Sequence, residues 1–255
     1  MILFGINMGG IKMKKLILSS IFFLAIIFLS CETYPSTSST FNSTSSRSSS
    51  SRPFSDFYDS WVDARSRQDV IALKAGENPK LIRSNNLDDD IYEIVSDNYL
   101  IVGKTSFNGP SEDIIDDINS QCKKNGATIA LYSLEYAYTT GYYSIRRYDY
   151  SVYYFVKKTG SPDSFGFWVI DLSADDRRNL EMNTGAKVNV IYKYTPAFYA
   201  NFLRGDIIIS INGNNVTNAL DFDLYCMLND FTEDEEIEIV FIRRGQERKA
   251  KIRVE

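Results

Sequence analysis

The first long hydrophobic block of the chain is a continuous apolar run near the N-terminus. It spans residues 16–29, follows two lysines and is followed by Ser30 and Cys31. A basic start followed by about 14 apolar residues is typical of a secretory leader, because a membrane span needs about 20. We therefore predict a signal peptide over residues 1–30, with Met13 as the true start of the chain.

The pattern then changes to an almost purely polar segment. Residues 35–53 consist mainly of Ser and Thr and contain almost nothing that could be buried. Such a segment cannot offset the entropy of ordering its backbone, so we predict a flexible tether within residues 31–55. A tether of this length reaches roughly 25 Å and would let a folded domain stand clear of its anchor.

Mixed apolar and polar positions begin at residue 54 and predict a first folded domain over residues 56–160. Residues 60–73 are compatible with a helix, and the apolar-rich stretch 91–107 predicts extended chain. The pattern assigns no role to residues 54–84.

A helix is predicted to follow, because its apolar residues repeat with helical spacing. Ser111 can cap its start, and Gly126 follows its last turn. Ile114, Ile118 and Cys122, together with Ile115, fall on one face that would pack against a sheet. We therefore expect Cys122 to be a core thiol.

Two strands, over residues 127–138 and 151–157, complete a small β-α-β-β domain around a turn that contains Gly141. This part of the chain is rich in tyrosine. Aromatic surfaces bind sugars and peptides well, but half-exposed strands also carry tyrosines, so a ligand role and a structural role both stay open. The tyrosines are 132, 136, 138, 142, 143, 148, 150, 153 and 154.

Residues 163–255 predict a second domain with more strands than helices. Pro196 suits the first turn of a short helix, residues 207–211 form an apolar strand, and Asn212–Gly213 favours a tight turn after it. A helix over 218–228 and a closing hairpin between 236 and 254 complete the element order. The whole chain therefore belongs to the α+β class.

The amino-acid composition excludes several classes of function. The chain has no histidine, so it cannot hold a Ser-His-Asp triad, a Cys-His pair or a histidine-ligated zinc. Its three cysteines, at 31, 122 and 226, match no metal or disulfide framework, and we expect no metal and no cofactor. A formal net charge of −5, which becomes more negative once the lysine-bearing leader is removed, disfavours nucleic acid as a partner.

The end of the leader, Phe28-Leu29-Ser30-Cys31, resembles the bacterial lipobox. The resemblance implies cleavage before Cys31 and acylation of that cysteine, which would hold the protein on a membrane. A plain signal peptide or an uncleaved anchor helix remains the alternative. Glu32 does not resemble the aspartate that retains lipoproteins in the inner membrane. We therefore expect a lipid-anchored protein of the bacterial cell envelope, in the outer membrane.

The segment TPAFYANFLRGDIIISINGNNVTN, residues 195–218, resembles the PDZ domains of bacterial high-temperature-requirement proteases, without their protease domain. The stretch that starts at Ser106 is also similar to sequences ahead of PDZ domains in bacterial lipoproteins of unknown role. The resemblance implies a PDZ-like, partly open β-barrel with two helices after the β-α-β-β domain. Asn201 replaces the glycine that the family has at a left-handed position, which asparagine tolerates.

By the same resemblance, an extended peptide would pair with one sheet edge, and its C-terminal carboxylate would meet the backbone N–H groups of a glycine-containing loop. A groove that is closed or filled by the chain itself is the alternative. The predicted peptide-binding residues are Phe165, Gly166, Phe167, Trp168, Val169 and Ile170 in the loop and strand, and Leu220, Leu224, Met227 and Leu228 on the helix; Tyr225 and Cys226 are further candidates.

Two functions follow, and neither is enzymatic. The first is an envelope adaptor that recognises C-termini or extended segments of other envelope proteins. The second is a surface or structural lipoprotein in which the tyrosine-rich domain binds the partner and the PDZ-like fold is a scaffold. A Ser-Lys dyad would need a separate catalytic domain, which we do not expect here, and Arg204-Gly205-Asp206 is expected to be a turn and no adhesion motif.

Overall fold

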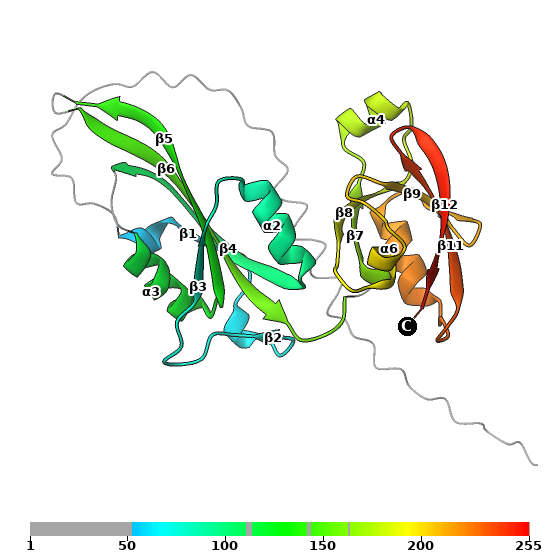
Figure 1. Ribbon diagram of the computed structural model, residues 1–255, viewed down its shortest axis with the longest axis horizontal. Helices are drawn as coiled ribbons and strands as arrows, with labels where there is room; N and C mark the ends of the chain where they lie inside the picture. Colours follow the sequence, from blue (N-terminus) through cyan, green and yellow to red (C-terminus); the bar gives the residue numbers. More distant parts are fainter. Residues whose placement is uncertain (1–52, 111–113, 142–143, 163, 255) are drawn as a thin grey trace, which may run out of the picture. The chain divides into compact units, whose positions relative to one another are not determined.

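The computed structural model describes residues 53–110, 114–141, 144–162 and 164–254. The predicted leader, the lipidation site Cys31, the tether and the predicted cap Ser111 lie outside these residues. The described chain has five α-helices and two six-stranded sheets, so the α+β class is confirmed (Figure 1). Within this described part, every helix is too short or too polar to cross a bilayer.

The first sheet lies in the middle domain, which we define as residues 53–162. Its strand order is β1-β4-β6-β5-β3, with β2 paired to β6. All its pairs are antiparallel except β3 with β5, which is parallel. The predicted β-α-β-β unit is present as β4, α3, β5 and β6, and further elements extend it. The bounds are η1 Phe54–Phe57, β1 Tyr58–Ser60, η2 Ala64–Ser66, β2 Val70–Ile71, β3 Lys80–Arg83, α2 Leu87–Ser96, β4 Tyr99–Pro110, α3 Ile115–Asn125, β5 Ile129–Thr140 and β6 Ile145–Lys158.

The two long helices of the middle domain cover opposite faces of its sheet. Ile118 and Cys122 of α3 belong to a buried cluster with Tyr154 of β6, whereas Val95 of α2 belongs to a cluster with the next residue, Phe155. Successive residues of a strand point to opposite faces, so the strands of this sheet are apolar on both sides. Cys122 is fully buried, as predicted.

The prediction of a helix over residues 60–73 was wrong. Most of this segment is irregular, with the three-residue turn η2 and the short strand β2. Asp63 accepts a hydrogen bond from the N–H of Arg65, which caps only that turn. The β-branched pair Val70–Ile71 then pairs with β6 and takes its backbone hydrogen bonds from the sheet.

The extended chain predicted for residues 91–107 begins later, at Tyr99, because residues up to Ser96 belong to helix α2. Asn86 caps this helix by accepting a hydrogen bond from the N–H of Asp89. The run Asp88 to Asp90 lies in its first turn, where the helix dipole stabilises acids. This cap and these acids were the signal in the sequence for a helix.

The second sheet lies in the C-terminal domain, which we define as residues 164–254. Its order is β12-β11-β9-β8-β7, with β10 paired to β9. The short helix α4 was not predicted; a capping box between Ser173 and Asp176 starts it. The bounds are η3 Ser164–Gly166, β7 Phe167–Asp171, α4 Ala174–Leu180, β8 Ala186–Ile191, α5 Pro196–Tyr199, β9 Ile207–Ile211, β10 Asn214–Asn215, α6 Ala219–Leu228, β11 Glu236–Arg243 and β12 Gln246–Arg253.

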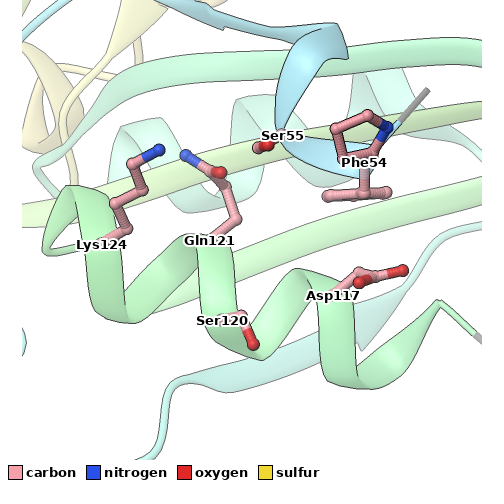
Figure 2. Close-up of a pocket in the computed structure, with 7 residues that line it drawn as sticks. Phe54, Ser55, Asp117, Ser120, Gln121 and Lys124 are labelled. Carbon is pink, nitrogen blue, oxygen red and sulfur yellow. The ribbon is translucent and has the colours of Figure 1, made fainter.

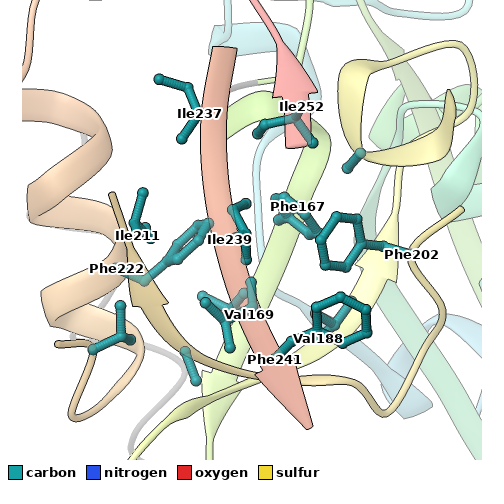
Figure 3. Close-up of a cluster of buried hydrophobic side chains, with 14 of the residues drawn as sticks. Phe167, Val169, Val188, Phe202, Ile211, Phe222, Ile237, Ile239, Phe241 and Ile252 are labelled. Atoms are coloured by element: carbon teal, nitrogen blue, oxygen red, sulfur yellow. The ribbon is translucent and has the colours of Figure 1, made fainter. Parts of the chain in front are cut away.

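Aromatic and β-branched side chains fill the core of the C-terminal domain (Figure 3). Phe222 enters it from α6, and its ring makes an edge contact with Phe167 of β7 at 5.6 Å between centroids. Phe167 also contacts Phe202 at 4.9 Å. One side of α6 and one face of β7 are thereby fixed to the same core.

The turn that contains the Arg-Gly-Asp tripeptide is part of the framework. Asp206 is 1% exposed, and its carboxylate accepts hydrogen bonds from Arg243 at 2.7 and 2.6 Å and from the N–H of Leu203 at 2.8 Å. The hydrogen bonds that Arg243 donates to Asp206 hold the pKa of Arg243 above its usual value. With its carboxylate buried in this way, Asp206 stabilises the turn.

A third apolar cluster joins side chains of the two sheets within the compact unit that begins at Ser51. Val190 of β8 is buried there with Val95 of α2, and Trp168 of β7 packs against them. Lys193 lies beside this cluster and forms ion pairs with Glu93 at 2.8 Å and Asp97 at 3.2 Å. These contacts give Trp168 a packing role on the face of β7 that points away from the core of the C-terminal domain.

Candidate functional site

Strand β7 is the edge strand of the second sheet. It pairs with β8 on one side, and among the described strands no other pairs with it. Its side chains alternate, with Phe167 and Val169 buried in the core and Trp168 and Ile170 on the opposite face. An edge of this kind presents unpaired N–H and C=O groups that can accept a further strand.

The loop before β7 has an unusual backbone. Ser164, Phe165 and Gly166 have φ values of 54°, 59° and 90°, so three successive residues adopt the left-handed region. A non-glycine residue there costs about 1–2 kcal/mol, and such strain concentrates at binding sites. Successive N–H groups in turns of this type converge and can form a concave site for an anion.

Contacts on all sides hold this loop in place. Gly166 packs against Thr195, and a Cβ on this glycine would lie 2.0 Å from the Thr195 Oγ1 atom. The Gly166 carbonyl accepts a hydrogen bond from the N–H of Tyr192 at 2.9 Å. The ring of Phe165 packs edge-on against Phe231, with 4.9 Å between centroids. The loop conformation is therefore preformed by packing.

Helix α6 is fastened beside β7 at both of its ends. At its start, the N–H of Ala219 donates a hydrogen bond of 2.9 Å to the carboxylate of Asp171, which is the last residue of β7. Near its end, α6 contacts the loop Ser164–Gly166, and Cys226 lies close to Ser164. The helix therefore runs along the open edge of β7, with its C-terminal end at the loop.

The apolar residues predicted on α6 lie on its exposed surface. The exposed fractions are 48% for Leu220, 40% for Leu224, 62% for Met227 and 78% for Leu228. The helix is apolar on two faces, because Phe222 on the other face is fully buried. Four exposed apolar side chains at helical spacing form a continuous stripe, of a kind that marks interaction surfaces. Their part in peptide binding stays a prediction.

One residue of α6, Asp223, was not among the predicted peptide-binding residues, whereas Cys226 was a further candidate. Residues i, i+4 and i+7 lie on one line along a helix, so Asp223 lies between Ala219 and Cys226 on the side fastened to β7 and the loop. The sequence could not reveal this, because an apolar repeat occurs on both faces of α6. Asp223, half-buried, and Cys226 therefore form the wall of α6 nearest to β7.

In this wall, the thiol of Cys226 is buried and lies close to the negative charge of Asp223. Burial, and then the negative charge of Asp223, raise the pKa of the Cys226 thiol to about 12. Residues 218–230 contain three aspartates and neither Lys nor Arg. The described residues form no group of three or more Cys, Asp or Glu that could hold a metal ion.

The middle domain also has a hollow in its surface. A shallow cavity of about 220 Å³ lies between η1 and α3, lined by Phe54, Asp117, Gln121 and Lys124 among others. Gln121 and Lys124 point from α3 toward the segment that carries Ser55 (Figure 2). The cavity combines one apolar wall with mostly polar side chains.

The tyrosine-rich hairpin of β5 and β6 divides into buried and exposed residues. Tyr150 and Tyr154 are core residues, exposed by no more than 1%. Tyr136 and Tyr138 are exposed by 59% and 50%, and Tyr136 makes an edge contact with Tyr148. Tyr132, Tyr148 and Tyr153 are half-buried, and Tyr142 and Tyr143 lie outside the described residues.

Comparison with known proteins identifies the C-terminal domain. The family model described as "PDZ domain" matches residues 164–254, and it does not extend into the middle domain. Residues 164–254 therefore form a PDZ domain, a peptide-binding module. A search of curated proteins finds no match to the chain.

Solved structures of other proteins are similar to part of the chain, including these two. The HtrA3 PDZ domain bound to a phage-derived ligand is 15% identical, with a TM-score of 0.30; the match covers 35% of this chain and 81% of that one. The HtrA-type protease AlgW with a tripeptide is 22% identical, with a TM-score of 0.32, over 34% of this chain and 29% of that one.

Proposed function

We propose that the C-terminal domain binds an extended peptide with a free C-terminus, which adds as a strand to the open edge of β7. One observation carries the proposal: the edge of β7 lies beside α6, and a loop of three left-handed residues stands at its start. Strand addition supplies backbone hydrogen bonds, and side-chain contacts with the neighbouring helix supply selectivity.

The loop is the proposed site for the terminal carboxylate. Backbone N–H groups that converge in left-handed turns bind anions, and packing against Thr195 and Phe231 holds this loop in shape before a ligand arrives. A preformed site loses less conformational entropy on binding. The exposed stripe from Leu220 to Leu228 would cover apolar side chains of the ligand.

At the level of the whole chain, we propose a non-enzymatic adaptor of the bacterial cell envelope. Acylation of Cys31 would hold it on the outer membrane, and the Ser/Thr-rich tether would let the folded part reach C-termini of other envelope proteins. The absence of histidine in the sequence supports a role in binding, because the common histidine-dependent hydrolases are excluded.

The test is peptide binding by the full chain in a non-ionic detergent, measured by fluorescence polarisation on a library of labelled peptides. Each peptide is used with a free and with an amidated C-terminus. We expect amidation to weaken binding by about tenfold or more, because a charge-assisted interaction is lost. Equal affinity for both forms would exclude carboxylate capture.

Helix variants locate the binding surface. Leu224→Asp places a charge in the middle of the exposed stripe and is expected to weaken binding. The matched control is Ile145→Asp, at a residue 48% exposed in the middle domain. A Gly166 variant is unsuitable for this purpose, because any side chain there collides with Thr195 and disturbs the fold.

The second candidate is binding of the partner by the exposed tyrosines of the middle domain, with the PDZ fold as scaffold. Tyr136 and Tyr138 support it, since each has at least half of its surface exposed on one hairpin. If the double variant Tyr136→Ser with Tyr138→Ser loses a partner that Leu224→Asp retains, this candidate is favoured.

A further inference from the structure

Strand β5 has a long open edge in the middle domain. On one side it pairs with β6 along its length, but on the other side β3 pairs with it only from Ile129 to Tyr132. The β5–β6 hairpin therefore extends beyond β3 (Figure 1). Among the described strands, none pairs with residues 133–140 on this second side. The backbone N–H and C=O groups along this edge can accept a further strand.

Apart from β7, the other free edges of the two sheets are short or charged. β1, β2 and β10 have only two or three residues each. β3 carries Lys80 and Arg83, and β12 has charged side chains at most of its positions. Shortness and charge are common ways of protecting a sheet edge from pairing. The open part of β5 is longer, and Glu135 is its one charged residue.

The side chains beside the open edge carry opposite charges on one face of the sheet. Glu135 lies opposite Asp149 of β6, and Tyr138 lies opposite Arg147. Asn108 accepts a hydrogen bond from Arg147 at 2.6 Å and donates one to Asp149 at 2.7 Å, so these side chains share a face. Like charges directly opposite each other repel. The neighbour of Glu135 in β6 therefore does not stabilise its charge.

We propose that a second copy of the chain pairs with this edge, with the two β5 strands antiparallel about a two-fold axis. Side chains directly opposite each other in such a pair lie on the same face of the sheet. The register of β5 against β6 shifts between Tyr136 and Tyr138, so Glu135 and Tyr138 lie on one face. A pairing that aligns Glu135 of each copy with Tyr138 of the other satisfies this condition.

The charges of this face favour a second copy over an unrelated strand. In the proposed register, Glu135 of one copy lies beside Tyr138 of the other, and Arg147 follows on the next strand of that copy. Two strand spacings amount to about 10 Å, which the long side chains of Glu and Arg can span across the tyrosine. The two-fold axis repeats every contact, so two such ion pairs form.

The exposed tyrosines of the hairpin are covered by the same pairing. Tyr136 and Tyr138 are 59% and 50% exposed, and both lie on the open part of β5. Aromatic side chains beside a cross-strand neighbour contribute to strand pairing. The tyrosines would then serve contact between two copies.

Sedimentation equilibrium of the full chain, in a non-ionic detergent matched in density to the solvent, tests the proposal. The variants are Glu135→Lys, Arg147→Glu and the double variant with both changes. The matched controls are Glu247→Lys and Arg248→Glu, which make the same charge changes at exposed positions of β12. Circular dichroism checks that each variant is folded.

The wild type is expected to form a dimer. Each single variant should weaken the dimer by about tenfold, because two symmetry-related ion pairs are replaced by like charges. The double variant restores opposite charges across the axis and should recover most of the affinity. Both controls should dimerise like the wild type. Higher salt should weaken the wild-type dimer.

Cysteine cross-linking tests the register without relying on the charge variants. Glu135→Cys and Tyr138→Cys chains are mixed and treated with a mild oxidant. A disulfide joins Cα atoms about 4.4–6.8 Å apart, so the mixture should give cross-linked dimers and neither variant alone should give them. Equal cross-linking by either variant alone would contradict the antiparallel register.

A wild type that stays monomeric over the whole concentration range overturns the proposal. So does a dimer that the two single variants leave unchanged, because the copies then associate through another surface. The peptide site is tested separately, since β5 and β7 belong to different sheets. Glu135→Lys should bind peptide as the wild type does, whether or not it dimerises.

Discussion

The carboxylate of Asp171, at the end of strand β7, accepts a hydrogen bond from the backbone N–H of Ala219, at the start of helix α6, at 2.9 Å. The two residues are 48 positions apart in the sequence. The bond satisfies one of the N–H groups that every helix leaves unpaired at its start, and it places a negative charge at the positive end of the helix dipole. It also fixes the distance between the two walls of the proposed groove.

Removing this bond should loosen the groove. We expect Asp171→Ala to lower stability by about 1 kcal/mol, the usual cost of a lost helix cap, and to weaken peptide binding by about fivefold. Asp171→Asn retains an acceptor oxygen, so it should keep most of the stability and most of the peptide affinity. Urea denaturation and fluorescence polarisation measure the two effects. An unchanged affinity for Asp171→Ala would show that the bond does not set the groove width.

The ion pair between Arg243 and Asp206 should be a major stabilising contact of the C-terminal domain. Asp206 has a side chain 2% exposed, so Arg243→Leu leaves a buried charge without its partner, at a cost of about 3–5 kcal/mol. Replacing both residues by Leu should recover part of this loss. Chemical denaturation of the single and double variants gives the comparison. If Arg243→Leu lowers the free energy of unfolding by less than about 1 kcal/mol, water solvates the Asp206 carboxylate in place of the arginine.

Both described cysteines should react slowly in the native protein. Burial raises the pKa of Cys122 to about 12, and burial together with Asp223 raises the pKa of Cys226 to the same value. Little thiolate is then present at pH 8, so alkylation followed by mass spectrometry should label both residues far more slowly than in urea. Rapid labelling of Cys226 in native protein would show that the wall of α6 opens.

The raised pKa of Cys122 also predicts how the stability of the fold depends on pH. A thiol whose pKa is higher in the folded state favours folding while it is protonated in both states. This contribution should therefore be full below pH 9.0, the ordinary value, and should be lost as the pH rises toward about 12. Cys122→Ala should flatten this part of the stability profile. An equally steep profile in the variant would assign the loss to other groups.

Two glycines with similar backbone angles should respond differently to substitution. Gly166 and Gly245 have φ values of 90° and 74°, so alanine is strained by about 1 kcal/mol at either position. A Cβ at Gly245 meets nothing within 4 Å, whereas at Gly166 it overlaps Thr195. We expect Gly166→Ala to be clearly more destabilising than Gly245→Ala in thermal melts. Similar melting temperatures would mean that Thr195 moves aside at little cost.

Local signals in the sequence were sufficient to predict most strands and helices of the C-terminal domain. The strand 207–211 occurs at the predicted bounds, and the closing hairpin lies within residues 236–253, because apolar strand residues and flanking turn residues are signals that extend over only a few positions. The same holds for the helix that starts after Thr195, where Pro196 occupies the first turn. The helix at residues 87–96 was missed, although its cap Asn86 and its acidic first turn were visible in the sequence.

The sequence by itself therefore determined the α+β class and, apart from the missed helix α4, the main elements of the C-terminal domain. Tertiary structure decided which side of α6 faces β7, since a helix that is apolar on both faces gives periodicity no means of choosing between them. The contacts of Asp171 with Ala219 and of Ser164 with Cys226 made that choice, and they placed Asp223 on the side of α6 that faces β7. Such contacts join residues about 50 or more positions apart, and chain connectivity alone does not specify them.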